Sequence, residues 1–226
     1  GLLEIVHQQL GARGLWLYPT LLWLSPSDGF IHVLCALGTL AAVALALGLA
    51  PLAGLLVLWV CYLSLATVGQ DFLWFQWDGL LLETTVVAML LAPRVWRMRG
   101  AADPPPPGAA LFLVRWLIFR LMLSSALAKW GSGDPTWRHL TALQFHYETQ
   151  PLPPWTAWYA HHLPARFQAF SAAAMFAIEG LAPFLIALPR HPRMLAAGAF
   201  AFLQLLILLT GNYGYFNLLA LVLCLP

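Results

Sequence analysis

The chain has 226 residues, of which 61% are hydrophobic and 9% are charged, whereas an ordinary soluble domain carries roughly 25% charged residues. This composition excludes a soluble globular enzyme. Eleven basic residues against nine acidic ones give a net charge of +2, which is not the clustered positive field that binds a phosphate backbone, so nucleic acid is excluded as a partner.

Several apolar stretches reach the length of about 20 residues that a membrane-spanning helix needs. The first follows a helix start signal at 25–29, and Pro51 separates it from the second, so these two should form an antiparallel hairpin. The predicted runs, the last of them cut short, are 30–50, 52–68, 72–92, 109–129, 167–188, 194–210 and 213–226. Between the last two runs, residues 210–217 form a break whose side-chain amides, together with Gln204, could donate hydrogen bonds across the bundle.

These runs predict an all-α fold, a polytopic membrane helix bundle with about six or seven transmembrane helices. No repeat divides it, so residues 1–226 are expected to form a single transmembrane domain. The chain begins with Gly1 and no signal-peptide pattern follows, so we expect it to be a fragment of a longer protein.

Two segments are too polar to span a membrane. Residues 93–108 contain three arginines and the proline run 104–107, whose missing amide donors predict an extended linker. Residues 130–166 form a longer loop with four of the seven histidines. If every run spans, five arginines lie on the side of 93–108 and 189–193, so the positive-inside bias predicts a cytosolic linker and a lumenal or extracytoplasmic loop.

Polar side chains are concentrated within or beside the predicted spans, where an ionised group costs about 2.5–3.5 kcal/mol at the helix centre. Asp71 and Asp78 are seven residues apart, as are Gln76 and Glu83, so each pair should project from one helix face. The predicted intramembrane polar cluster comprises Gln70, Asp71, Gln76, Asp78, Glu83, Arg115, Arg120, Lys129 and Glu179.

Antiparallel neighbouring helices would bring opposite charges of this cluster together. We predict that Glu83 pairs with Arg120, and that Asp71 or Asp78 pairs with Lys129. These groups are then structural ion pairs that fix helix register, or they line a cavity that handles protons or binds a substrate. The sequence leaves both interpretations open.

The long loop should lie on the membrane surface. Asp134 or Thr136 can cap a short helix that ends at Gln150, before a proline-rich turn, and on this helix His139 and His146 would face one way. The loop contains Trp and Tyr rings, which are favoured at the level of the lipid headgroups. No H-x-x-x-H or H-E-x-x-H spacing is present, so we expect no metal, no cofactor and no catalytic motif. The candidate loop residues are Trp137, His139, His146, Tyr147, Glu148, His161 and His162.

Motifs along most of the chain resemble the lipase maturation factor family. They include VGQDFLWFQWD at 68–78, FRLMLSS at 119–125, HYETQPLP at 146–153, WYAHHLP at 158–164 and LTGNY at 209–213. The resemblance implies a polytopic endoplasmic-reticulum membrane protein in animals, required for folding and assembly of secreted dimeric lipases, with the long loop in the lumen. It also implies a further membrane helix before this region and a large lumenal domain after it. Relatives occur in bacteria, where the location would be the inner membrane.

Two function classes follow. The first is a non-enzymatic maturation factor, in which the bundle is a scaffold in the lipid bilayer and the loop presents aromatic and polar groups to a secreted client such as a lipase. The second is a membrane enzyme or carrier that uses Asp71, Asp78, Glu83 and Arg120 around a buried polar cavity, distantly like the membrane domain of vitamin K-dependent carboxylases. We favour the first, and a cavity that converges on these charges would favour the second.

Overall fold

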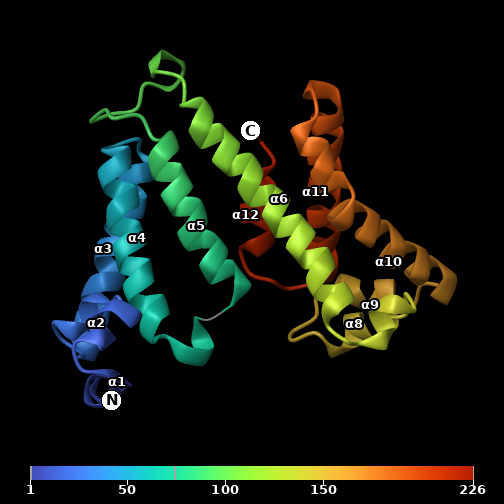
Figure 1. Cartoon of the computed structure of the whole chain (residues 1–226), viewed down its shortest axis with the longest axis horizontal. Helices are drawn as coiled ribbons and strands as arrows, with labels where there is room; N and C mark the ends of the chain where they lie inside the picture. Colours follow the sequence, from blue (N-terminus) through green and yellow to red (C-terminus); the bar gives the residue numbers. More distant parts are fainter. Residues whose placement is uncertain (1, 74, 226) are drawn as a thin grey trace. The chain divides into compact units, whose positions relative to one another are not determined.

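The computed structural model describes residues 2–73 and 75–225, and these residues form helices joined by turns. They divide into two compact units, one ending at Leu111 and the other beginning at Phe112. The helices of the first unit are α1 (Leu2–Leu10), α2 (Arg13–Leu17), η1 (Leu21–Trp23), α3 (Asp28–Ala46), α4 (Pro51–Val68), η2 (Gln70–Phe72), α5 (Gln76–Leu91) and η3 (Gly100–Ala102). The second unit holds most of α6 (Gly108–Gly131), followed by α7 (Pro135–Arg138), α8 (Leu143–Thr149), α9 (Trp155–His161), α10 (Ala165–Gly180), η4 (Ala182–Ala187), α11 (Arg190–Thr210) and α12 (Phe216–Leu223). Figure 1 labels the α-helices other than α7 and colours them in chain order. The predicted all-α class is confirmed, and the single-domain prediction stays a prediction.

Five helical segments of the described chain are long and apolar enough to cross a membrane. They are Asp28–Ala46, Pro51–Val68, Gly108–Gly131, Ala165–Ala187 and Arg190–Thr210. At 1.5 Å per residue, the 16 residues of α5 extend about 24 Å, which is less than the roughly 30 Å of a hydrocarbon core. The polytopic bundle is therefore confirmed with five candidate spans in place of six or seven.

The first unit is built on the α3–α4 hairpin. Ser27 caps α3 by accepting a hydrogen bond from the Phe30 amide at 3.3 Å, and Pro51 occupies the first turn of α4, where its missing N–H is harmless. After α5, the chain returns to the hairpin turn, because the Ala50 amide donates to the Trp96 carbonyl at 2.6 Å. The carboxyl end of α5 and the α3–α4 turn therefore lie at the same end of this unit.

In the second unit, small side chains let the helices approach closely. Ala172 of α10, Ala196 of α11 and Ala220 of α12 are each 0% exposed, as is usual where membrane helices pack. The predicted break separates α11 from α12, and Asn217 Nδ2 donates to the Gln204 carbonyl at 3.0 Å. A side-chain amide thus joins these two helices, as predicted.

The run predicted at 167–188 is not one continuous helix. It divides into α10 and the 3-10 segment η4. Pro183, which is buried in η4, has no amide to donate to the preceding turn. The break therefore falls directly after Glu179 and Gly180.

The loop holds more helices than predicted. The single helix expected from residue 134 or 136 to Gln150 is wrong, because it is interrupted between α7 and α8, where Leu140 adopts a φ of 59°. His139 ends α7 while His146 lies within α8, so the two histidines do not share a helix face. A third helix, α9, begins directly after Pro154, which is its N-cap residue.

Candidate functional site

Asp78 is the one deeply buried acid of the predicted third span, and it lies in the first turn of α5. Its side chain is 3% exposed. One carboxyl oxygen accepts a hydrogen bond from Tyr62 of α4 at 2.5 Å, and the other accepts one from the Phe75 amide at 2.8 Å. Asp78 therefore caps α5 and joins it to α4, which is the role of an acidic residue at the third helical position.

The remaining residues of the 70–83 segment do not behave as one helix face. Gln70 and Asp71 belong to η2, before α5 begins, and both are exposed, as is Gln76. The predicted projection of Asp71 and Asp78 from one helix face is therefore wrong. Gln70 adopts a φ of 47°, which turns the chain between α4 and α5 and shortens the expected span.

Glu83 lies on α5 and Arg115 and Arg120 lie on α6. These helices fall largely in different compact units. The predicted ion pair between Glu83 and Arg120 consequently stays a prediction.

Lys129, at the end of α6, has a different partner from the one predicted. Its ammonium group donates to both carboxylate oxygens of Glu179 on α10, at 2.7 and 2.9 Å. The predicted pairing of Lys129 with Asp71 or Asp78 would join the two compact units and stays a prediction. Glu179 is nearly buried, with a side chain 5% exposed, and such a charge requires a partner in a membrane domain.

Aromatic rings of the loop cover this ion pair. The Lys129 Nζ atom lies 5.8 Å from the centroid of the Trp137 ring on α7, which is within the range of a cation–π contact. Trp137 and Trp130 both meet Phe176 of α10 edge to face, at 6.2 and 6.0 Å between ring centroids. Trp137, one of the predicted loop residues, therefore attaches α7 to α10 and to the end of α6.

A second set of contacts fixes α8 and α9 to the end of α11, and we call it the loop anchor: His146, Gln150, Thr156 and Tyr213, with the carbonyls of 209 and 210. His146 Nε2 lies 3.0 Å from the Tyr213 hydroxyl. Gln150 Nε2 donates to the Thr210 carbonyl at 2.7 Å, and Thr156 donates to the Leu209 carbonyl. The last turn of α11 leaves carbonyls without helical partners, and the loop supplies their donors.

Gly211 is required at the centre of the loop anchor. A Cβ atom there would lie 2.4 Å from the Tyr213 ring and 3.1 Å from the Gln150 side-chain oxygen. The absence of a side chain therefore lets Tyr213 fold back toward His146. Four positions of the motif LTGNY at 209–213 take part in this packing: Leu209, Thr210, Gly211 and Tyr213.

Burial shifts the pKa values of side chains in and beside the loop anchor. The pKa of His146 is lowered, first by burial and second by the positive charge of Lys129. Burial raises the pKa of Tyr213 and of the neighbouring Tyr147. The neutral forms of all three side chains are therefore favoured in the folded loop.

The anchor is expected to loosen in acid because of His146. A detached loop would bind a proton near the ordinary histidine pKa of about 6.5, whereas the folded loop binds it only at lower pH. The attachment is therefore at full strength above that value and weakens as the pH falls toward the lowered pKa. Hydrogen exchange of residues 143–161 at pH 7.5 and at pH 5, corrected for the intrinsic pH dependence of exchange, should show lower protection factors in acid, and His146→Gln should remove most of the difference. Equal protection of the unmodified protein at both pH values would contradict this role.

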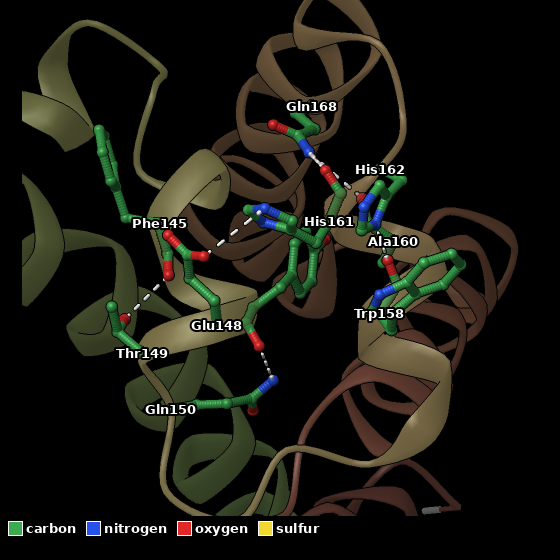
Figure 2. A network of polar contacts seen from close by, with 10 residues as sticks. Phe145, Glu148, Thr149, Gln150, Trp158, Ala160, His161, His162 and Gln168 are labelled. Carbon is green, nitrogen blue, oxygen red and sulfur yellow. Dashed lines mark hydrogen bonds and ion pairs between the residues drawn. The ribbon is translucent and has the colours of Figure 1, made fainter.

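Figure 2 shows the rest of the loop network, around α8 and α9. Glu148 points toward His161, with 3.7 Å between the carboxylate oxygen and Nε2. Gln168 of α10 donates to the carbonyl of His161 at 2.8 Å, and His162 Nδ1 lies 2.7 Å from the Trp158 carbonyl. Glu148, His161 and His162 are thus near one another as part of the loop's internal structure, while His139 lies apart and exposed at the end of α7.

Sequence reasoning missed part of this site. The sequence pattern predicts Gln150 only as a helix end and gives no role to Gln168. Gln168 is 4% exposed and interrupts an apolar run. A polar side chain at such a position indicates a buried hydrogen-bonded amide. No sequence signal brings Thr156 to the carbonyl of Leu209, because only the folded chain places α9 on α11.

While the buried side of the loop is fixed, its outer side is aromatic and exposed. Trp155 and Tyr159 of α9 are 77% and 61% exposed and meet edge to face. Trp158 and Leu152 are 60% and 80% exposed. Trp155, Trp158 and Tyr159 form a surface that we call the aromatic surface of α9, and such a patch marks a contact with protein or membrane.

The described residues form at least two cavities, one in each unit. The larger, of about 730 Å³, lies between α1, η1 and the start of α3 in the first unit. The smaller, of about 290 Å³, lies in the second unit beside Arg115, Arg190 and Arg193. Neither is lined by Asp71, Asp78, Glu83 or Arg120. In the described residues, no three metal-ligating side chains converge.

The five apolar spans and the short loop helices define the class of protein, an integral membrane protein with a helical loop fixed to one end of its second unit. Comparison with known proteins supplies the family. Residues 3–226 match the family described as lipase maturation factor transmembrane domain. The chain belongs to the lipase maturation factor family.

Individual relatives agree with this assignment. The chain is 48% identical to lipase maturation factor 2 of Gallus gallus, over 95% of its length and 32% of the relative's. It is 46% identical to lipase maturation factor 2 of Homo sapiens, over 92% of its length and 32% of the relative's. Lipase maturation factor 1 of Bos taurus is 34% identical over 97% of this chain and 40% of its own length. The chain thus spans about a third of the curated relatives it matches first, and no solved structure matches it.

Proposed function

We propose that this chain is the membrane scaffold of a lipase maturation factor of the endoplasmic reticulum, and that its loop assists the folding or assembly of a secreted lipase. In this proposal, residues 130–166 are lumenal and the linker 93–108 is cytosolic. The names of the relatives, which refer to lipase maturation, and the positive-inside bias support this arrangement.

The observation that carries the proposal is the two-sided structure of the loop. Its inner side is held to α10 by Trp137 and by the hydrogen bond from Gln168, and to the end of α11 by the loop anchor. Its outer side is the aromatic surface of α9. A rigid support under exposed aromatic side chains is an effective binding surface, because little conformational entropy is lost when a partner binds.

The polar residues predicted as site residues have supporting roles in this proposal. Asp78, Lys129 and Glu179 join helices to one another, while His146 and Gln150 hold the loop in place. The client contacts only the exposed side of the loop. Substitution of buried anchor residues and substitution of the aromatic surface should therefore have separable effects.

The test replaces Trp155 and Tyr159 together with serine in the full-length protein, in cells that lack their own copy and secrete a dimeric lipase. We expect the specific activity of secreted lipase to fall about tenfold. Two aromatic anchor residues that contribute about 2 kcal/mol each correspond to roughly a thousandfold in affinity, which is ample for a tenfold loss of activity. The amount of membrane-inserted protein should not change.

The matched control is Trp96→Ser, because Trp96 is 81% exposed but lies in the linker, on the predicted cytosolic side. It should leave secreted lipase activity unchanged. Full lipase activity with the loop variant at normal protein levels, or an equal loss with Trp96→Ser, would refute the assignment of the client surface to α9.

A further inference from the structure

The second unit contains a basic cavity that the maturation function does not use. The cavity of about 290 Å³ lies between α6, η4, α11 and the end of α12. Its walls include Arg115, Arg190 and Arg193, and no Asp or Glu is among the described residues that line it. Three arginines therefore contribute to the walls of one small cavity.

The three arginines come from two helices that meet at one end of the unit. Arg190 and Arg193 lie in the first turn of α11, whose leading amides also favour an anion. Arg115 is the eighth residue of α6, which places it about 10 Å along the helix from its start. Arg190 is exposed, while Arg115 and Arg193 are half-buried. The charges thus extend from the surface of the unit into its interior.

The rest of the cavity is apolar. Ile118, Ile186 and Phe200 line it, and the side chains of Met194 and Leu195 beside it are exposed to the surroundings. A volume of about 290 Å³ is at the lower limit of the roughly 300–1,000 Å³ of small-ligand sites. The cavity can hold a phosphate with its glycerol, while attached acyl chains would lie along the exposed apolar side of α11.

We propose that this cavity binds the phosphate group of an anionic phospholipid headgroup. Planar guanidinium groups bind phosphate oxygens in pairs of hydrogen bonds, and basic pockets between membrane helices on the cytosolic side bind acidic headgroups. The cavity lies on the side that the arginine distribution predicts to be cytosolic. The site is therefore on the opposite side of the membrane from the loop.

The test uses full-length protein in detergent and a fluorescent short-chain phosphatidylinositol phosphate as the probe. Arg190→Gln with Arg193→Gln should weaken binding about 30-fold, because each basic residue near an anionic surface contributes about fivefold. Ala197→Phe keeps the charges but fills the cavity, since Ala197 lines it, and it should weaken binding at least as much. The control, Arg94→Gln with Arg99→Gln, removes two exposed arginines outside the cavity and should bind the probe normally.

Competitors identify the source of the phosphate. Displacement of the probe by short-chain phosphatidylserine, but not by inorganic phosphate, supports a lipid headgroup site. Displacement by inorganic phosphate at equal affinity supports the phosphate site with a soluble anion as its occupant. Equal weakening in the control variant, unchanged binding in Ala197→Phe, or equal displacement by phosphatidylcholine would overturn the proposal. None of these results depends on lipase secretion, so they are independent of the proposed client surface.

Discussion

Replacing Lys129 with methionine is expected to lower the free energy of unfolding of the second unit by about 3–5 kcal/mol. The substitution leaves the Glu179 carboxylate, 5% exposed, without the ammonium group that contacts both of its oxygens. Removing one partner of a buried ion pair typically costs that much, because the other charge stays desolvated. Unfolding in mixed micelles, monitored by tryptophan fluorescence, would measure the change.

The double variant Lys129→Met with Glu179→Leu is the control for this prediction. It removes both charges, so it should recover most of the lost stability. Arg138→Met removes a basic residue that is exposed on the loop and should change stability by less than about 0.5 kcal/mol. If Lys129→Met were as stable as Arg138→Met, the ion pair would not support the unit.

Replacing Asp78 with alanine should destabilise the first unit by about 2–3 kcal/mol. The substitution removes the acceptor of the Tyr62 hydroxyl and the cap of the Phe75 amide, and a hydrogen bond to a charged group contributes roughly 1.5–3 kcal/mol. The loss should also appear as faster hydrogen exchange in the first turn of α5, which measures the cap separately from the contact with α4.

A double-mutant cycle distinguishes the two contacts of Asp78. Tyr62→Phe alone should cost less than Asp78→Ala, and the combined variant should cost less than the sum of the two. Gln76→Ala lies in the same turn of α5 but is exposed, so it should be nearly neutral. Strict additivity of Tyr62→Phe and Asp78→Ala would mean that the hydroxyl and the carboxyl group do not stabilise each other.

Both predictions concern polar residues whose observed partners join helices. Lys129 and Glu179 join α6 to α10, and Tyr62 and Asp78 join α4 to α5. The two described cavities are lined by neither Asp78 nor Glu179. These contacts agree with the scaffold interpretation, and nothing here favours a membrane enzyme or carrier.

The sequence determined by itself that the chain is an α-helical membrane protein, where most helices lie and which family it resembles. Length and hydropathy suffice for that, because a bilayer requires long apolar helices with internally bonded backbones. The break after α11 and the start of α3 within the predicted start signal at 25–29 also follow from local rules, since caps and helix breakers act on their immediate neighbours.

Only the tertiary structure decided which polar groups meet. Lys129 contacts Glu179, 50 positions away, and His146 contacts Tyr213, 67 positions away. Helical spacing predicts which side chains share a face of one helix, but not which helices become neighbours or how far each is tilted and broken. Which helices become neighbours depends on close packing at small residues such as Ala172 and Ala196. This packing involves several helices at once, so it cannot be inferred from the sequence of one helix.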